Sequence, residues 1–362
     1  MPLNGPRPTA LSAALPPARA TTVHRGTTAV VIGLLALTTA ACSSDAETST
    51  TPDTDATTAA SSTTSYPLTL DNCGVEVTVE SAPTAVVTIK SSTTEMLLAL
   101  GVGDRIVGTA YPDGPVADWL MEDAAANPAI DAPLSDKVPG HEAVLALAPD
   151  LVYAGWESNL TAEGAGARDS FATFGVATYV APSACKADGY QPDPLTFDDV
   201  FDEIEEVGEM FDVSAEATEL VAAQRADLDA VVADDRGLTA LWYSSGSDIP
   251  YVGAGIGAPQ MIMDTVGLEN VAEEIHDTWG PFSWEEAIAD DPDVIVLVDS
   301  PWNSADSKIE MLEGNPATAN LTAVREGRYL EVPFPATEAG VRSVWAAQHL
   351  SEQLAALEIT AD

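Results

Sequence analysis

The sequence predicts an α/β fold in which two Rossmann-like lobes, each with a mainly parallel sheet, are joined by one long helix and face each other across a cleft. Short apolar strands alternate with helical segments in both halves of the chain, and a long helical stretch separates the halves. A repeated pattern also occurs once in each half. We therefore expect an N-terminal lobe over residues 66–213, a connecting helix over 214–236, and a C-terminal lobe with a terminal helix over 237–362.

The N-terminal half shows the alternation that is typical of a parallel sheet. A first apolar strand ends at Lys90, and the hydroxyl side chains from Ser91 to Thr94 can cap the helix that follows. Gly101 is expected to end that helix. The expected strands and helices, in chain order, are Val86–Ile89, Glu95–Leu100, Ile106–Ala110, Glu142–Ala148, Leu151–Ala154, Arg168–Phe174 and Val176–Val180.

The middle of the chain differs, because two helical segments follow each other without a strand between them. These segments are Thr196–Phe211 and Ala215–Asp235, and the second would be about 30 Å long. Strand and helix then alternate again. The later elements are expected at Leu238–Tyr243, Pro259–Val266, Trp284–Ala289, Val294–Val298, Tyr329–Val332 and Gly340–Leu357.

The repeated pattern is a Glu that lies seven residues before a Pro-Asp pair, which in turn opens an apolar strand. Glu142 precedes Pro149-Asp150 in the first half, and Glu285 precedes Pro292-Asp293 in the second. A helix followed by Pro-Asp and a strand is common in α/β proteins, so one copy is weak evidence for a particular fold. Two copies on either side of a long helix indicate a duplicated two-lobe fold.

The composition excludes several classes of function. The 362 residues include 57 Asp and Glu against 14 Lys and Arg, a formal charge of −43. Such an acidic chain would be repelled by the phosphates of nucleic acid, and it has no basic helix for a membrane surface. Hydrophobic residues make up 46% of the chain, which argues for a folded protein.

The first 41 residues have the features of a bacterial lipoprotein signal peptide. Arg7, Arg19 and Arg25 precede an apolar run over residues 29–37 that is too short to span a bilayer. The run leads into small residues and Cys42, which we expect to be lipidated and to become the new N-terminus. The alternative is an ordinary cleaved signal with a chance Cys. Residues 42–65 form an expected Ser/Thr-rich flexible tether, which would hold the folded part near the membrane.

Two cysteines remain in the predicted folded part, Cys73 and Cys185. An even number of cysteines outside the cytoplasm favours a disulfide, here closing a loop of over 100 residues. That closure would be worth about 4–5 kcal/mol in the chain-entropy description. The alternative is two buried free thiols.

These features together resemble the ABC-transporter solute-binding proteins that capture ferric siderophores, haem and cobalamin. Residues 87–101 are similar to the opening motif of that family, and the resemblance covers about residues 66–358. Four longer stretches are similar to an actinobacterial subgroup named for uptake of a precursor of the deazaflavin coenzyme F(420). They are residues 150–159, 182–186, 242–247 and 251–257.

The resemblance implies where the protein works and what it meets. The protein would be a monomer held outside the cytoplasm on the cell membrane by its lipid, with an ABC permease dimer and its ATPase as partners. The rigid connecting helix would allow the lobes to close only slightly around a ligand. In this family one exposed Glu on each lobe docks on Arg pockets of the permease, and Glu142 and Glu285 occupy the matching places. The alternative is that both belong to an ordinary solvated acidic surface.

Candidate ligand-binding residues lie where the predicted strands end, because α/β sheets bind their ligands at that edge. Trp and Tyr side chains there can stack on a flat or ringed ligand. The predicted ligand-binding residues are Lys90, Ser91, Ser92, Thr93, Tyr111, Trp156, Glu157, Lys186, Tyr243, Ser244, Ser245, Trp302 and Arg342.

Three scarce cations in that set suggest a negatively charged ligand. Lys90, Lys186 and Arg342 could bind phosphate, carboxylate or an anionic iron chelate, and Lys90 precedes a helix N-terminus that favours anions. The alternative for each is a salt bridge with one of the many acids. The glycines between Gly253 and Gly257 do not fit a dinucleotide motif, so we expect a tight turn or close approach to the ligand.

No pattern for catalysis or metal capture is present. The three histidines after the signal peptide, His141, His276 and His349, are not spaced as a ligand pair, and no nucleophile motif occurs. We expect no cofactor, no metal ligand and no catalytic residue. The leading hypothesis is a binding lipoprotein of an ABC importer for a deazaflavin precursor or a ferric siderophore, with cobalamin ranked lower. The alternatives are an extracellular enzyme and a surface sensor or adhesin.

Overall fold

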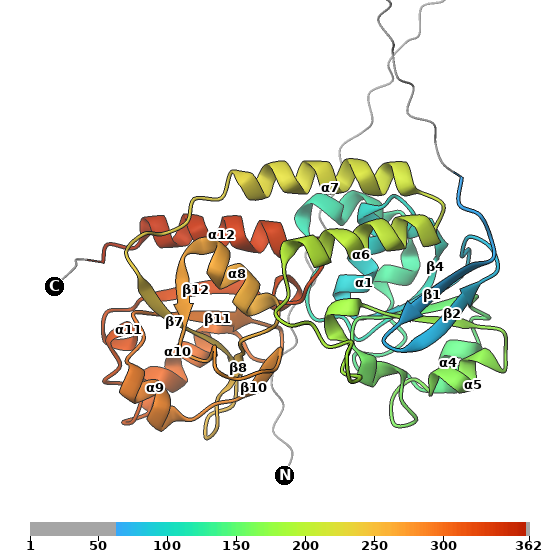
Figure 1. Ribbon diagram of the computed structural model, residues 1–362. Helices are drawn as coiled ribbons and strands as arrows, with labels where there is room; N and C mark the ends of the chain where they lie inside the picture. The colour runs from blue at the N-terminus through green and yellow to red at the C-terminus, as the bar shows by residue number, and fades with distance from the viewer. Residues whose placement is uncertain (1–62, 360–362) are drawn as a thin grey trace, which may run out of the picture. The chain divides into compact units, whose positions relative to one another are not determined.

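The computed structural model describes residues 63–359. The predicted signal peptide, the predicted lipidation site Cys42 and the tether up to residue 62 lie outside the described residues. Across the described part of the chain, no helix is both long enough and apolar enough to cross a membrane. The structure has two lobes, each built on its own sheet (Figure 1).

The N-terminal lobe contains a four-stranded parallel sheet with the strand order β4-β3-β5-β6. All four strands were predicted, because strands covered on both faces by helices read as short continuous apolar runs. An antiparallel hairpin of β1 and β2, which was not predicted, packs beside β6. The strands are β1 (Leu68–Asn72), β2 (Val75–Val79), β3 (Val86–Ile89), β4 (Ile106–Ala110), β5 (Leu151–Ala154) and β6 (Ala177–Val180).

The C-terminal lobe contains a mixed six-stranded sheet with the order β10-β8-β7-β11-β12, in which β9 also pairs with β7. The central strands β7, β11 and β12 are parallel, and β8 and β10 add an antiparallel edge. The strands are β7 (Leu238–Ser245), β8 (Tyr251–Gly253), β9 (Leu268–Asn270), β10 (Trp279–Pro281), β11 (Val294–Asp299) and β12 (Tyr329–Pro333).

Helices cover the sheets and connect the lobes. The α-helices are α1 (Ser91–Ala99), α2 (Met121–Ala125), α3 (Pro128–Asp131), α4 (His141–Leu145), α5 (Arg168–Ala172), α6 (Phe197–Met210), α7 (Ser214–Asp229), α8 (Ala258–Val266), α9 (Trp284–Asp290), α10 (Ala305–Gly314), α11 (Thr322–Arg325) and α12 (Ser343–Ala356). Within residues 63–359, five short 3-10 helices, η1 to η5, occupy Gly103–Arg105, Asp118–Leu120, Glu157–Leu160, Pro182–Ala184 and Phe334–Ala336.

The connecting helix is α7, which is shorter than the prediction of residues 214–236. It ends at Asp229, and the following loop is held by hydrogen bonds to the C-terminal lobe. Asp234 donates its N–H to the carbonyl of Val266, and the Arg236 guanidinium bonds the carbonyls of Leu354 and Leu357. These bonds hold the loop against the lobe in place of further helical turns.

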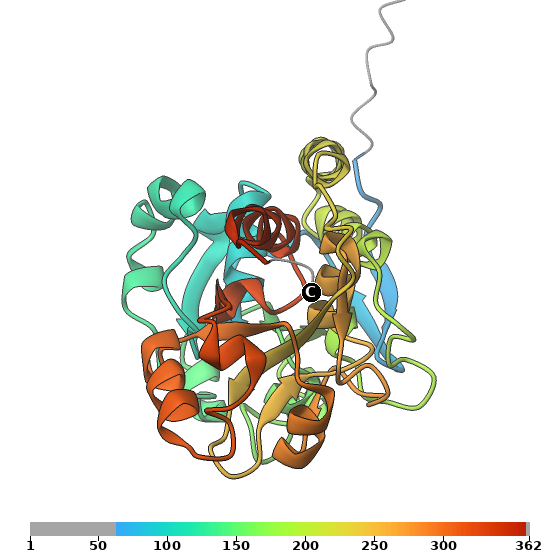
Figure 2. The same cartoon turned by 90° about the vertical axis from the view of Figure 1, so that its left-hand side faces the viewer.

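Helices α7 and α12 lie side by side, lengthwise in Figure 1 and end-on in Figure 2. One continuous cluster of buried apolar side chains runs from the N-terminal lobe, through these helices, into the C-terminal lobe. Met96 and Phe201 belong to it on one side, and Trp242 and Leu350 on the other. Because close-packed interiors resist deformation, this shared core favours a nearly fixed angle between the lobes.

The repeated Pro-Asp pair has the same structural role in both lobes. Asp150 accepts hydrogen bonds from the N–H and hydroxyl of Thr84, just before β3. Asp293 accepts the same two bonds from Thr239, at the start of β7. Each Asp therefore fixes the beginning of the neighbouring central strand, which explains why the pattern occurs once per lobe.

The predicted disulfide between Cys73 and Cys185 is present, with a Cα–Cα distance of 5.3 Å. It joins the turn of the β1–β2 hairpin to the loop after β6. That loop carries Lys186, so the disulfide fixes the base of a segment that reaches the space between the lobes.

Candidate ligand-binding cleft

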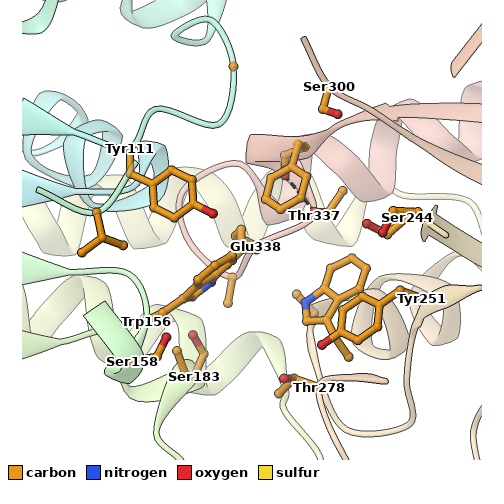
Figure 3. Close-up of a pocket in the computed structure, with 18 of the residues that line it drawn as sticks. Tyr111, Trp156, Ser158, Ser183, Ser244, Tyr251, Thr278, Ser300, Thr337 and Glu338 are labelled. Carbon is orange, nitrogen blue, oxygen red and sulfur yellow. Dashed lines mark hydrogen bonds between the residues drawn. The ribbon is translucent and has the colours of Figure 1, made fainter. Parts of the chain in front are cut away.

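A cavity of about 1260 Å³ lies between the two lobes and is lined by residues of both (Figure 3). The lining residues of the N-terminal lobe follow β4, β5 and β6, and many of those from the C-terminal lobe lie at the end of β7 or follow β11 and β12. Parallel strands place their carboxyl ends at one edge of a sheet, so these loops converge on the cleft. The predicted cleft between the lobes is confirmed.

Aromatic and hydroxyl side chains make up much of the cavity wall. Tyr111 meets Trp156 edge to face with ring centroids 5.8 Å apart, and Trp302 lies 5.4 Å from Phe334. The aromatic lining residues are Tyr111, Trp156, Tyr251, Trp279, Trp302 and Phe334. The hydroxyl-bearing ones besides the tyrosines are Ser158, Ser183, Ser244, Ser245, Thr278, Ser300 and Thr337. This wall suits a large ligand with rings and several hydrogen-bonding groups.

The cavity brings together seven of the predicted ligand-binding residues. These are Tyr111, Trp156, Glu157, Lys186, Ser244, Ser245 and Trp302. The other six do not line it: Lys90, Ser91, Ser92, Thr93, Tyr243 and Arg342. The reasons differ from residue to residue, but the two cations Lys90 and Arg342 share one. Each is already paired with a buried carboxylate of the protein.

Lys90 is buried and its charge is already neutralised by the protein. Its Nζ lies 2.5 Å from Oδ1 of Asp113 and 3.4 Å from the centroid of the Trp156 ring. The N–H of Ser91, at the start of α1, donates to the other oxygen of Asp113. The anion site expected beside this helix N-terminus therefore exists, but the carboxylate of Asp113 occupies it.

The hydroxyl residues after Lys90 belong to α1 and do not cap it from outside. The helix begins at Ser91 and not at Glu95 as predicted, and its N-cap residue is Lys90, without a side-chain capping bond. The Oγ of Ser91 accepts the N–H of Asp113, and the hydroxyl of Thr93 donates to the carbonyls of Ile89 and Lys90. These two hydroxyl groups stabilise the protein itself.

Arg342 and Tyr243 are also engaged within the protein. Arg342, at the N-terminus of α12, forms a buried ion pair with Glu95 of α1 and donates to the carbonyl of Pro115. This pair joins the two lobes, and neither residue lines the cavity. Burial raises the pKa of Glu95, and the bonds from Arg342 oppose that effect. The hydroxyl of Tyr243 donates to the carbonyl of Gly246.

Lys186 spans the cleft from one lobe to the other. Its Nζ forms an ion pair with Asp277 and donates to the hydroxyl of Thr278 at 3.1 Å. Its backbone N–H donates to Glu157 at 2.5 Å. The Lys186 side chain is half exposed, so this pair is accessible to solvent and to a ligand.

Gly255 and Gly257 allow close approach to the protein's own backbone, and Gly253 to the side chains of Pro259 and Trp242. A Cβ on Gly255 would lie 1.9 Å from the carbonyl oxygen of Glu273. The N–H groups of Ala254 and Ile256 donate to the carbonyls of Thr278 and Asp277. These contacts hold Asp277 and Thr278 in the cavity wall.

Glu338 was not predicted as a site residue, although it lines the cavity and is only 9% exposed. Its Oε2 accepts the indole N–H of Trp156 at 2.6 Å, which is a further link between the two lobes. Burial raises the pKa of Glu338, while the nearby Lys90 lowers it. The sequence shows Glu338 only as one acid among many, in a segment between Pro335 and Gly340.

Acids outnumber bases in the cavity wall. Among the described residues that line it, the carboxylates are Asp136, Glu157, Asp277 and Glu338, and the only cations are Lys137 and Lys186. Within residues 63–359, no cluster of three His, Cys, Asp or Glu side chains could hold a metal ion. The wall as a whole therefore favours a neutral or positively charged ligand over an anion.

Glu142 and Glu285 occupy equivalent places in the two lobes. Each is the second residue of a short helix, α4 or α9, and each is exposed. Glu285 also accepts a hydrogen bond from the hydroxyl of Ser283, the N-cap residue of α9. Figure 1 shows α4 and α9 along the lower edge of the view, with α7 and α12 along the upper edge.

Known proteins with the same architecture identify the family. A family profile described as periplasmic binding protein matches residues 86–336. The chain is 24% identical over 298 residues to the Bacillus subtilis (strain 168) protein named "Uncharacterized ABC transporter substrate-binding lipoprotein YvrC", covering 80% of this chain and 86% of that protein.

Two solved structures are similar in fold and in sequence. A periplasmic binding protein from Veillonella parvula has a TM-score of 0.69 and 28% identity, covering 81% of this chain and 98% of its own. A structure titled as an ABC-type Fe3+-hydroxamate transport system, from Saccharomonospora viridis, has a TM-score of 0.68 and 27% identity. The match covers 80% of this chain and 99% of that one.

The two-lobe fold and the cleft define a solute-binding protein. The chain belongs to the periplasmic binding protein family, and it is a substrate-binding protein of the ABC-transporter type. The resemblance inferred from the sequence is therefore confirmed at the level of the family.

Proposed function

We propose that this protein is the lipid-anchored binding subunit of an ABC importer and that it captures a ferric chelate of the hydroxamate class. The observation that carries the ligand class is the cleft of about 1260 Å³, with an aromatic wall and more acids than bases. This cavity is larger than the typical site for a drug-sized molecule, so it suits a bulky organic ligand.

The charge of the wall separates the two ligand classes considered from the sequence. An anionic deazaflavin precursor would need cations free to bind it, but Lys90 and Arg342 are buried in pairs with Asp113 and Glu95. In the described cavity wall, Lys186 is paired with Asp277, which leaves Lys137 as the cation outside an ion pair. A ferric trihydroxamate has a neutral coordination core, because three hydroxamate anions balance Fe³⁺. The iron–hydroxamate title of the Saccharomonospora viridis relative supports the same class.

The proposed partner is a permease dimer that meets the edge formed by α4 and α9. Glu142 and Glu285 lie on separate lobes, so together they can contact both permease subunits. Charge-assisted bonds to Arg side chains would hold each contact. The proposed anchor is a lipid on Cys42, followed by the tether over residues 43–65.

Isothermal titration calorimetry of the mature chain in detergent tests the ligand class. We expect one-to-one binding of a ferric trihydroxamate with a micromolar or lower dissociation constant, and weaker binding of flavin mononucleotide, an anionic ringed probe. Tighter binding of the flavin phosphate than of the ferric chelate would contradict the assigned class.

A further inference from the structure

The carboxylate of Glu338 has one oxygen without a partner in the cavity wall. Oε2 accepts the Trp156 indole N–H at 2.6 Å, but Oε1 is buried and has no hydrogen-bond partner among residues 63–359. The side chain comes from the loop between η5 and α12. A buried acceptor without a donor costs free energy, so a donor from outside the chain would stabilise this oxygen.

The neighbouring lysine does not supply that donor. Lys90 directs its ammonium group to Asp113, among the rings of Tyr111, Trp156 and Phe334. One cation therefore lies near two buried carboxylates, those of Asp113 and Glu338. An additional positive charge from a ligand would balance this group.

We propose that the Glu338 carboxylate turns about Oε2 when a ligand binds, so that Oε1 faces the cavity and accepts a hydrogen bond from an ammonium group on the ligand. The cleft would then select chelates with a cationic arm. This inference rests on the proposed function and narrows its ligand class. Glu338 then acts as a specificity-determining residue, and Trp156 holds its carboxylate in position through the other oxygen. The aromatic rings beside it would also favour a nearby cation.

Two ferric chelates that differ in one group test this inference on the unmodified protein. The ferric complex of desferrioxamine B carries one primary ammonium group, and its N-acetylated form is neutral at the same position. We expect the unmodified mature protein to bind the ammonium form about 10- to 100-fold more tightly, as for a hydrogen bond between charged groups.

The variant Glu338→Gln keeps an acceptor for Trp156 but removes the carboxylate charge. It should bind the two chelates with affinities within about threefold of each other, through loss of affinity for the ammonium form. Asp136→Asn is the matched control, because Asp136 lines the same cavity and is exposed. This control should keep most of the preference if Glu338, and not the general negative charge, is responsible.

The outcomes separate this inference from the function on which it rests. Equal binding of both chelates by the unmodified protein, or tighter binding of the acetylated form, overturns the role of Glu338 and leaves the ligand class intact. The role of Glu338 is also overturned if Glu338→Gln keeps the preference for the ammonium form, or if Asp136→Asn abolishes that preference. Binding of neither chelate overturns the hydroxamate class and this inference with it.

Discussion

The indole N–H of Trp156 donates to Oε2 of Glu338 at 2.6 Å, although the two residues lie on different lobes. Trp156 follows β5 of the N-terminal lobe, and Glu338 precedes α12 of the C-terminal lobe. Both line the cavity, so a polar contact between the lobes lies within the proposed ligand site. We therefore expect ligand binding and the positions of the lobes to be coupled at this pair.

Replacing Trp156 by Phe should weaken both folding and ligand binding. The substitution removes the donor of Oε2, so that neither oxygen of Glu338 has a protein donor, and it reduces the aromatic surface over the Lys90 ammonium. An unsatisfied buried carboxylate predicts a loss of about 1–3 kcal/mol in the free energy of unfolding. Urea unfolding measures the change, and Trp302→Phe, at a 58% exposed position, is the control with little expected effect. Equal losses in both variants would contradict the role of the hydrogen bond.

The buried pair of Arg342 and Glu95 should be essential for stability. Removing one partner, as in Arg342→Met, leaves the Glu95 carboxylate buried without its counterion, and this predicts a loss of about 3–5 kcal/mol in the free energy of unfolding. The exposed pair of Arg225 and Asp198 provides the control, since Arg225→Met should cost at most about 1 kcal/mol. Similar losses at the two sites would mean that the buried pair does not join the lobes as we describe.

A buried glutamate behind the N-terminal sheet predicts a pH dependence of stability. Glu203 of α6 accepts a hydrogen bond from the hydroxyl of Tyr153, with the two oxygens 2.6 Å apart, and burial raises the pKa of Glu203 from 4.5 to about 7. The folded protein binds the proton of the Glu203 carboxyl more tightly than the unfolded chain does. The stability that Glu203 contributes is therefore lost as pH rises from about 4.5 through 7. The rise in pKa corresponds to about 3 kcal/mol.

The variant Glu203→Gln should remove that pH dependence. The free energy of unfolding of the variant, minus that of the unmodified protein, should rise by up to about 3 kcal/mol from pH 5 to pH 8. Urea unfolding at the two pH values measures the difference. Glu205→Gln, an exposed position on the same helix, should show no such change. A difference between pH 5 and pH 8 that is the same for both variants would contradict the assignment.

Transport should depend on the two exposed glutamates while ligand binding should not. The double variant Glu142→Ala, Glu285→Ala should lose uptake of labelled chelate in cells, because the permease would lose its contact on each lobe. Its ligand affinity should stay within about twofold of the unmodified protein. The control double variant Glu219→Ala, Glu352→Ala removes exposed acids from α7 and α12 and should transport normally. Normal uptake by the first variant would rule out these glutamates as docking residues.

Most of the fold could be predicted because its central strands are buried on both faces. β5 reads as the apolar run Leu151–Ala154, and its observed bounds match the prediction. The short strands β8 and β10 could not be predicted. They are three residues each and include Gly253 and Gly280, and they pair with each other at the antiparallel edge of the sheet.

The candidate site was predictable in part: Tyr111, Trp156 and Trp302 were predicted among its aromatic residues, whereas Tyr251, Trp279 and Phe334 were not. Among the charged residues, Glu157 and Lys186 line the cavity as predicted, but Lys90 and Arg342 do not. Trp156 and Trp302 follow apolar strands, so their place at the cleft follows from the order of the elements. The partners of the cations lie far along the chain, since Arg342 and Glu95 are 247 residues apart. Local sequence does not show which of the 57 acids neutralises a given cation.

Quenching of tryptophan fluorescence by a ferric trihydroxamate tests the central claim most directly, because Trp156, Trp279 and Trp302 all line the cavity. We predict saturable quenching, which Trp119→Phe, a variant outside the cavity, retains. The double variant Trp156→Phe, Trp302→Phe should lose much of the quenching amplitude. Quenching that does not saturate, or that is the same in all three proteins, would contradict capture of the chelate in the cleft between the lobes.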